Sequence, residues 1–167
     1  MTTVRVGLDL AKNVFQVHGV DEHGAVTFRK QIKRVQLSAF FAQLPPALVG
    51  MEACGGSHHW ARVLAAFGHE VRIMAAEFVR PYVKSNKNDE LDAEAICEAV
   101  GRPNMRFVSV KTVDQQSVLS LHRAREAMVS ARTAEINRVR GLLAEFGIVV
   151  AQGLRSFMRD VPAEVDA

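Results

Sequence analysis

The sequence has few of the residues that mark secreted, zinc-binding or membrane proteins. Its two cysteines, Cys54 and Cys97, form neither a CxxC pair nor another spacing typical of a zinc site. A disulfide-built fold is therefore excluded, and a reduced, cytoplasmic setting is expected. No apolar run approaches the length of a transmembrane helix, and no apolar stretch of a signal peptide follows the first five residues. The sequence thus predicts no membrane partner.

Internal repeats, low-complexity tracts and a strong excess of one charge are also missing. The 21 Lys+Arg residues oppose 18 Asp+Glu residues, and the formal net charge of +3 is only a mild bias towards polyanions. Hydrophobic residues, in contrast, make up 49% of the 167 residues. This is enough for one domain with a core and for a possible appendage.

Strand and helix patterns alternate in the first half of the chain. Apolar runs with strand periodicity and stretches with helical spacing of apolar residues are separated by turn residues. The expected strands are 4–10, 13–20, 25–31, 47–52 and 71–75, and the expected helices are 36–44 and 57–67, the latter with Ser57 as N-cap. This order predicts an α/β fold in which three antiparallel strands precede parallel ones, with helices on both faces of a mixed sheet.

The second half has a different pattern. Residues 113–146 contain no proline, and only Gly141 interrupts their helical spacing of apolar side chains. They predict one long helix or a helical hairpin, and a single helix would be about 50 Å long at 1.5 Å per residue. Packing against another copy as a coiled coil and burial as a core helix are both open. Its arginines, among them Arg123, Arg132 and Arg138, form either a solvated face or a nucleic-acid contact.

Four acidic residues follow a pattern typical of a divided metal site. Asp9 and Glu52 end apolar strand-like runs, and Asp89 and Asp92 lie three residues apart at the start of a helix-like run. Carboxylates brought together repel one another unless a divalent cation neutralises them. The pattern therefore favours a magnesium-dependent phosphoryl-transfer site. The alternatives are a strand-end cap at each strand and ordinary N-terminal helix charge for the aspartate pair.

Basic residues near these carboxylates are candidates for contacts with a nucleic-acid backbone. Lys12 follows Asp9, and three others precede Asp89: Arg80, Lys84 and Lys87. A second basic cluster, at 29–34, fits the protective charge of an exposed strand edge better. His58 and His59 follow the Gly55-Gly56-Ser57 turn and fit polar residues at a helix start better than metal ligands. Trp60 and Tyr82 are expected to pack in the interior.

The segments Gly7-Leu8-Asp9-Leu10-Ala11-Lys12, Met51-Glu52-Ala53-Cys54-Gly55 and Lys87-Asn88-Asp89-Glu90-Leu91-Asp92-Ala93 resemble the DEDD motif of insertion-sequence-110 transposases and Piv-type DNA invertases. The resemblance covers about residues 4–150, and the lysine-asparagine-aspartate block is its most specific part. It implies an RNase H-like, RuvC-like catalytic domain at 1–110, a coiled-coil region at 111–147 and a C-terminal tail at 148–167.

The resemblance also implies what such a protein does. Asp9, Glu52, Asp89 and Asp92 would be catalytic metal ligands for Mg²⁺, with Mn²⁺ able to substitute. The activity would be strand transfer on DNA during transposition or inversion, guided in some family members by a structured RNA. Family members act as homo-oligomers, and the long helix would mediate that assembly.

One departure from the family concerns its second domain, which carries a serine thought to attack DNA. Ser156 is the only serine after the long helix, and nothing in its surroundings assigns it that role. We therefore expect the chain to be an N-terminal part that keeps the metal site and lacks half of the recombination chemistry.

Two other functions remain open at this point. An actin-like or sugar-kinase-like nucleotide-binding protein also opens with a strand ending in Gly-x-Asp, but its first loop is glycine-rich, and residues 10–13 contain no glycine. A non-catalytic module that binds nucleic acid and assembles subunits would need the same fold and the same long helix. Metal-dependent nicking separates that module from an enzyme.

Overall fold

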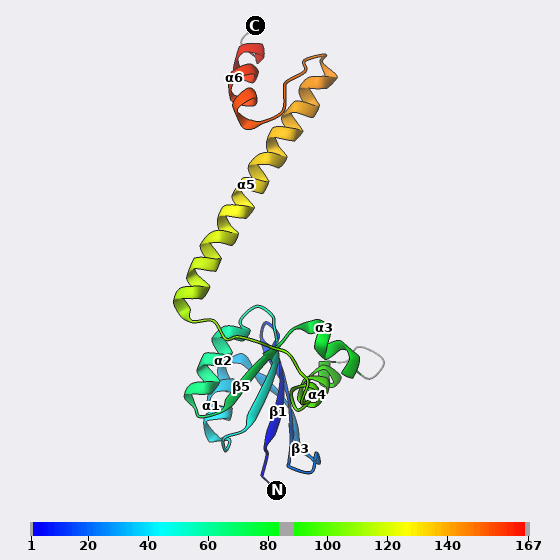
Figure 1. Ribbon diagram of the computed structural model, residues 1–167, viewed down its shortest axis with the longest axis vertical. Coiled ribbons are helices and arrows are strands. Elements are labelled where there is room, and N and C mark those ends of the chain that lie inside the picture. The colour runs from blue at the N-terminus through cyan, green and yellow to red at the C-terminus, as the bar shows by residue number, and fades with distance from the viewer. Residues whose placement is uncertain (1, 84–88, 166–167) are drawn as a thin grey trace. The chain divides into compact units, whose positions relative to one another are not determined.

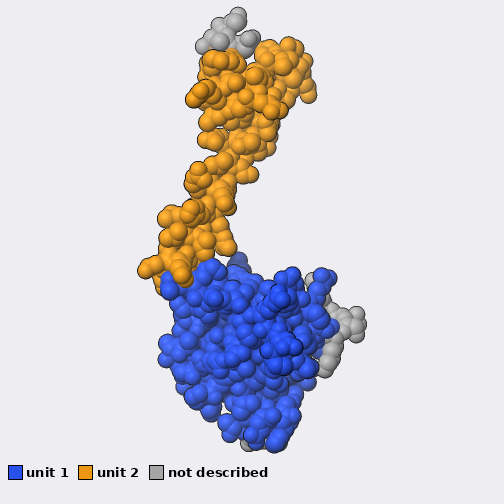
Figure 2. All heavy atoms as spheres, viewed as in Figure 1, with its two compact units in different colours: residues 1–112 blue, residues 113–167 orange. Residues whose placement is uncertain are grey.

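In the computed structural model, which describes residues 2–83 and 89–165, the chain divides into two units, residues 1–112 and 113–167 (Figure 2). The side chains of residues 89–90 and 163–165 are outside the description. The first unit contains a six-stranded sheet in the order β3-β2-β1-β4-β5-β6. Its strands are β1 (Arg5–Asp9), β2 (Val14–Val20), β3 (Val26–Lys33), β4 (Leu48–Glu52), β5 (Glu70–Met74) and β6 (Phe107–Val108).

The pairing of these strands makes the sheet mixed. Strands β1, β2 and β3 form an antiparallel meander, β4 is parallel to β1 and β5 is parallel to β4. The short strand β6 is antiparallel to β5. Both β1 and β4 are therefore interior strands, and their burial explains their nearly continuous apolar sequences.

Helices cover both faces of the sheet (Figure 1). On one face, α1 (Leu37–Gln43) and α2 (Ser57–Ala66) bury Phe41, Trp60 and Leu64 against Leu8 and Met51. His69 connects α1 to the residue before β4, because its Nδ1 accepts from the Ala47 amide at 3.2 Å and its Nε2 lies 3.0 Å from the Phe41 carbonyl. This layer is the larger of the two cores of the first unit.

On the other face, α4 (Asp89–Val100) packs against β1, β2 and β4. Ile96, Ala99 and Val100 form a second core there, together with Met74 and with Val79 of α3 (Ala76–Val79). The 3-10 helix η2 (Arg80–Tyr82) follows α3, and a second 3-10 helix, η1 (Arg34–Gln36), precedes α1. The predicted mixed α/β fold is thus confirmed.

One predicted detail is wrong. Ser57 was expected to be the N-cap of α2, but the helix begins at Ser57, and the capping position belongs to Gly56, whose φ is 92°. Only glycine adopts this left-handed conformation at little cost. The Ser57 hydroxyl instead donates to the Cys54 carbonyl at 2.9 Å and so closes the turn behind Glu52.

In the second unit, α5 (Val113–Glu145) is a single helix of 33 residues that passes through Gly141. A helical hairpin within 113–146 is therefore wrong. Burial as a core helix is also wrong for the chain by itself, because no residue of α5 is buried. A further helix that the sequence did not predict, α6 (Leu154–Val165), lies in the segment expected to be a tail. Within the described residues, no helix is long and apolar enough to cross a membrane.

Candidate functional site

Two acidic residues lie at the carboxyl ends of adjacent parallel strands. Asp9 is the last residue of β1 and Glu52 the last of β4, and their predecessors Leu8 and Met51 are register partners. Parallel strands in register end at the same edge of a sheet, so the two half-buried carboxylates are neighbours there. The apolar residues before them are fully buried, which fixes both backbones.

Gly7 brings a third carboxylate to this edge. A Cβ atom at Gly7 would lie 2.0 Å from the Ala93 carbonyl oxygen and 2.5 Å from the Cys97 amide nitrogen. Helix α4 therefore crosses β1 in direct backbone contact, which only glycine permits. Asp92 precedes Ala93 and is half-buried, so this close crossing places it beside the end of β1.

The charges at this edge interact. Burial raises the pKa of Glu52, and the negative charge of Asp92 raises it further. Burial also raises the pKa of the Cys54 thiol, with added contributions from the charges of Glu52 and Asp9. These effects connect Asp9, Glu52 and Asp92 around one small region, where each ionised carboxylate disfavours the others.

The exposed Cys54 is a neighbour of the site that sequence reasoning did not single out. Its thiol lies among carboxylates, and because its pKa is raised it stays protonated at neutral pH. The only sequence signal was its position two residues after Glu52. Cys54 therefore adds no charge to the metal-free site.

The oxygen donors at this edge suit a hard divalent cation. Asp9, Glu52 and Asp92 supply carboxylates, and the fourth expected ligand, Asp89, has a side chain outside the described part of the structure. Among the described residues, no group of three or more acidic, histidine or cysteine side chains is close enough to hold a metal ion. The raised pKa of Glu52 fits a site whose repulsion a cation would relieve.

Glu52→Gln should stabilise the metal-free protein at neutral pH. Because the pKa of Glu52 is raised on folding, the folded chain binds this proton more tightly than the unfolded chain. The stabilisation that this proton gives is complete below the pKa of Glu52 in the unfolded chain. It is lost as pH rises through the pKa of Glu52 in the folded chain. Substitution should remove that pH dependence and add well under about 1 kcal/mol at pH 7, since the group is largely solvated. Thermal unfolding between pH 4 and 8 with a chelator measures it, and lower stability of the variant at pH 7 would contradict it.

The expected nucleic-acid contacts fall in several places. Lys12 is exposed after β1, and its carbonyl accepts from Arg34 Nε at 2.8 Å, which steadies the loop beside Asp9. Arg80 is exposed at the start of η2. Lys84 and Lys87 lie outside the described residues.

The arginines of α5 do not form one stripe. Arg123, Arg132 and Arg138 are all exposed. At 3.6 residues per turn, the first two lie about 180° apart around the helix. Arg138 also pairs with Glu135 at 2.6 Å. A nucleic acid along one side of α5 would therefore meet only some of these charges.

The two histidines stand in the first turn of α2. Nδ1 of His58 accepts from the Lys111 amide at 3.2 Å, and its Nε2 lies 3.0 Å from Lys111 Nζ. His59 packs edge-on against Trp60. Trp60 itself is buried, as predicted.

Comparison with known proteins shows which family the chain is similar to. Residues 6–148 match the transposase family of the IS110 DEDD type. The chain is 59% identical over 152 residues to a probable family 20 transposase of Pseudomonas aeruginosa, covering 91% of this chain and 45% of that protein. It is 50% identical over 151 residues to the putative transposase y4pF/y4sB of Sinorhizobium fredii, covering 90% of this chain and 39% of that protein.

A third relative is the transposase for insertion sequence element IS1328 of Yersinia enterocolitica. It is 47% identical over 161 residues, which are 95% of this chain and 48% of that protein. The chain thus spans less than half the length of each of these relatives. Since the family match runs from the second residue of β1 to just past α5, the chain belongs to the insertion-sequence-110 family of DEDD transposases.

Proposed function

We propose that the chain is the metal-dependent catalytic domain of a DNA transposase, which transfers phosphoryl groups between DNA strands during transposition or inversion. The observation that carries this proposal is that Asp9 and Glu52 end neighbouring parallel strands in register. The charge of Asp92 adds to burial in raising the pKa of Glu52, which supports a place for Asp92 near them. The relatives are more than twice as long as the segments that match this chain, so the complete reaction is proposed for a protein of their length.

An RNase H-like, RuvC-like fold is the architecture we propose for residues 1–110. Its support is the antiparallel meander β1-β2-β3 followed by β4 and β5 parallel to β1, with helices on both faces. In this arrangement the first strand is central and ends in an acidic residue, and the next parallel strand ends in another. Helix α4, which crosses β1, begins at Asp89 and carries Asp92.

The residues that would hold Mg²⁺, or Mn²⁺ in its place, are Asp9, Glu52, Asp89 and Asp92. A divalent ion bound there would stabilise charge on the oxygens of the phosphate under attack. Asp9 and Glu52 are fixed by buried strands, so they would define the position of the scissile phosphate. Asp92, which stands on a separate helix, would supply a further carboxylate oxygen to the ion.

DNA is the proposed substrate, and the partner in assembly is a second copy of the chain. Helix α5 has no buried residue, yet it exposes Leu121, Met128 and Leu142 at multiples of seven residues. This heptad spacing suits a coiled coil between copies at 111–147. A structured guide RNA would be a second polyanion for the same basic residues.

A second candidate function is supported by the same helix. If the carboxylates do not bind metal, the chain would serve as a module that assembles subunits and binds nucleic acid. Helix α5, none of whose residues is buried, favours assembly in either case. The nucleotide-kinase alternative has no comparable support, because the family match covers both the carboxylates and α5.

The experiment that tests the proposed function measures DNA cleavage by a protein of the relatives' length that carries this chain. Cleavage should require Mg²⁺ or Mn²⁺ and should be lost in the Asp9→Asn variant. Cleavage that persists in a chelator would contradict the metal site, and binding without any cleavage would favour the assembly module.

A further inference from the structure

A row of polar side chains extends from Asp9 across the two strands beside it. In the register of the sheet, Asp9 opposes Gln16 of β2, and Gln16 opposes Gln31 of β3. Directly opposed residues share a face of the sheet, with Cβ atoms about 4.5–5.5 Å apart. The row Asp9, Gln16, Gln31 therefore leads from the carboxylates to the edge of the sheet.

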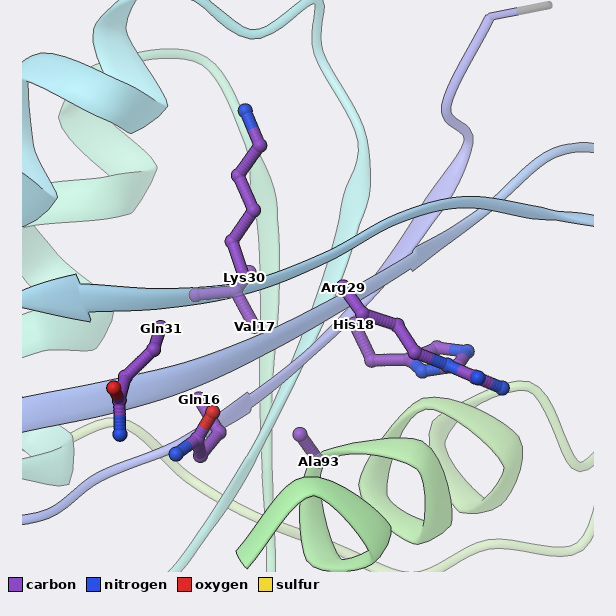
Figure 3. Close-up of a pocket in the computed structure, with 7 residues that line it drawn as sticks. All are labelled: Gln16, Val17, His18, Arg29, Lys30, Gln31 and Ala93. Atoms are coloured by element: carbon purple, nitrogen blue, oxygen red, sulfur yellow. The ribbon is translucent and has the colours of Figure 1, made fainter.

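The outer part of this row is open. Helix α4 packs against β1, β2 and β4, and Gln16 is half-buried beside it, whereas Gln31 is exposed. Arg29 and Lys33 lie two residues before and after Gln31, so they share its face, and both are exposed. Figure 3 shows Gln16, Gln31 and Arg29 on the side of the sheet that faces Ala93 of α4, with Lys30 pointing away from it.

These side chains have unused donors. Within the described residues, neither glutamine side chain has a protein hydrogen-bond partner. Arg29 makes an exposed ion pair with Glu94 at 3.2 Å, and its side chain is still 57% exposed. Amide and guanidinium groups together offer many N–H donors and positive charge, without adding a carboxylate next to Asp9. N–H donors and positive charge suit the negatively charged phosphates of a phosphodiester backbone, and the N–H groups can also donate to its sugar oxygens.

We propose that Gln16, Gln31, Arg29 and Lys33 form a strip that binds the phosphodiester backbone of the DNA strand whose scissile phosphate lies at Asp9. The strip rests on the proposed function, because it extends the same site. Arg29 exchanges Glu94 for a phosphate, and Lys33 supplies charge at the edge. The strip positions DNA and takes no part in the reaction.

The geometry sets the reach of the strip. Adjacent strands lie about 4.8 Å apart, so Gln31 is about 10 Å from Asp9 along the row. One strand of a duplex advances 3.4 Å per nucleotide. The strip therefore contacts phosphates within about three nucleotides of the one at Asp9, and longer DNA gains nothing from it.

Two neighbouring residues of β3 provide a matched test. Arg29 faces the strip, whereas Lys30 is exposed on the opposite face with its Nζ 5.4 Å from the Phe40 ring centre. Arg29→Gln and Lys30→Gln each remove one positive charge, so general attraction to DNA falls equally in both. Fluorescence anisotropy of the 167-residue chain with a labelled 20-nucleotide DNA, single-stranded and duplex, measures affinity against salt concentration.

The strip predicts that Arg29→Gln weakens DNA binding about three- to tenfold and lowers the salt slope by about one, while Lys30→Gln has less than half that effect. Gln31→Glu, which places a negative charge on the strip, should weaken binding at least as much as Arg29→Gln. Equal losses for Arg29→Gln and Lys30→Gln, no loss for Gln31→Glu, or no DNA binding by the unaltered chain at low salt would each overturn the proposal.

Two further measurements separate the strip from the metal site and from RNA. Mn²⁺ binding, followed by electron paramagnetic resonance without nucleic acid, should be unchanged in Arg29→Gln. If the unaltered chain binds no Mn²⁺, the proposed function is refuted. The differences in DNA affinity between the variants would still test the strip. An RNA of the same sequence offers the same phosphates, so Arg29→Gln should weaken its binding no more than it weakens DNA binding. A larger loss for RNA would overturn the assignment to DNA.

Discussion

Replacing Gly7 with valine is expected to unfold the first unit or to displace α4 from the sheet. A Cβ at this position would lie 2.0 Å from the Ala93 carbonyl oxygen and 2.5 Å from the Cys97 amide nitrogen. Both obstacles are backbone atoms, so a change of rotamer cannot relieve them. Overpacking against side chains costs about 1–3 kcal/mol. A collision with backbone atoms should cost more than this, and a typical domain has a free energy of unfolding of only about 5–15 kcal/mol.

The matched control for this substitution is Gly55→Ala. A Cβ at Gly55 meets nothing within 4 Å, although the residue lies in the loop just after Glu52. Urea unfolding of both variants, followed by circular dichroism, should show a loss above about 3 kcal/mol only for Gly7→Val. If Gly7→Val keeps the stability of the unaltered chain, the close crossing of β1 and α4, and with it the position of Asp92, is contradicted.

Asp9→Asn should abolish metal-dependent cleavage while leaving the fold intact. The substitution keeps the shape of the side chain and removes one of several mutually repelling charges, so the metal-free protein should unfold at the same temperature or slightly higher. Loss of an outer partner of a metal ligand typically costs about 10–100-fold in affinity or activity. Loss of a ligand itself should reduce cleavage by at least about a hundredfold.

Cys54→Ser is the control for Asp9→Asn. This thiol lies near both Asp9 and Glu52, but its raised pKa keeps it protonated, and we assign it no metal contact. Cleavage by Cys54→Ser should stay close to that of the unaltered protein. Equal losses in the two variants would mean that any disturbance of this loop stops the reaction, and the specific role of Asp9 would then be unsupported.

Most of the fold could be predicted from the sequence because apolar runs mark interior strands. The five predicted strands lie within two residues of β1 to β5, and the apolar spacing of residues 36–44 marks α1. The short elements α3 and β6 carry too few residues for any periodicity. Helix α6 follows Gly153, which has a positive φ, and contains Pro162. Both residues are typical of loops, so the sequence does not indicate a helix there.

The candidate site was less accessible from the sequence. Asp9 and Glu52 could be placed at strand ends by inspection, but their adjacency depends on β1 and β4 being parallel neighbours. The importance of Gly7 depends on which helix crosses β1, which no local pattern specifies. The row from Asp9 to Gln31 likewise requires the registers of two strand pairs. Each of these is a property of pairing between distant segments.

The central claim is that the carboxylates at this edge bind a divalent metal ion. The most direct measurement is a crystal structure grown with Mn²⁺, in which anomalous scattering locates the ion. We expect a manganese peak bounded by Asp9, Glu52 and Asp92, with Asp89 completing its ligands. Carboxylates that point to separate places, with no manganese between them, would contradict the claim and leave the chain as a module for assembly and nucleic-acid binding.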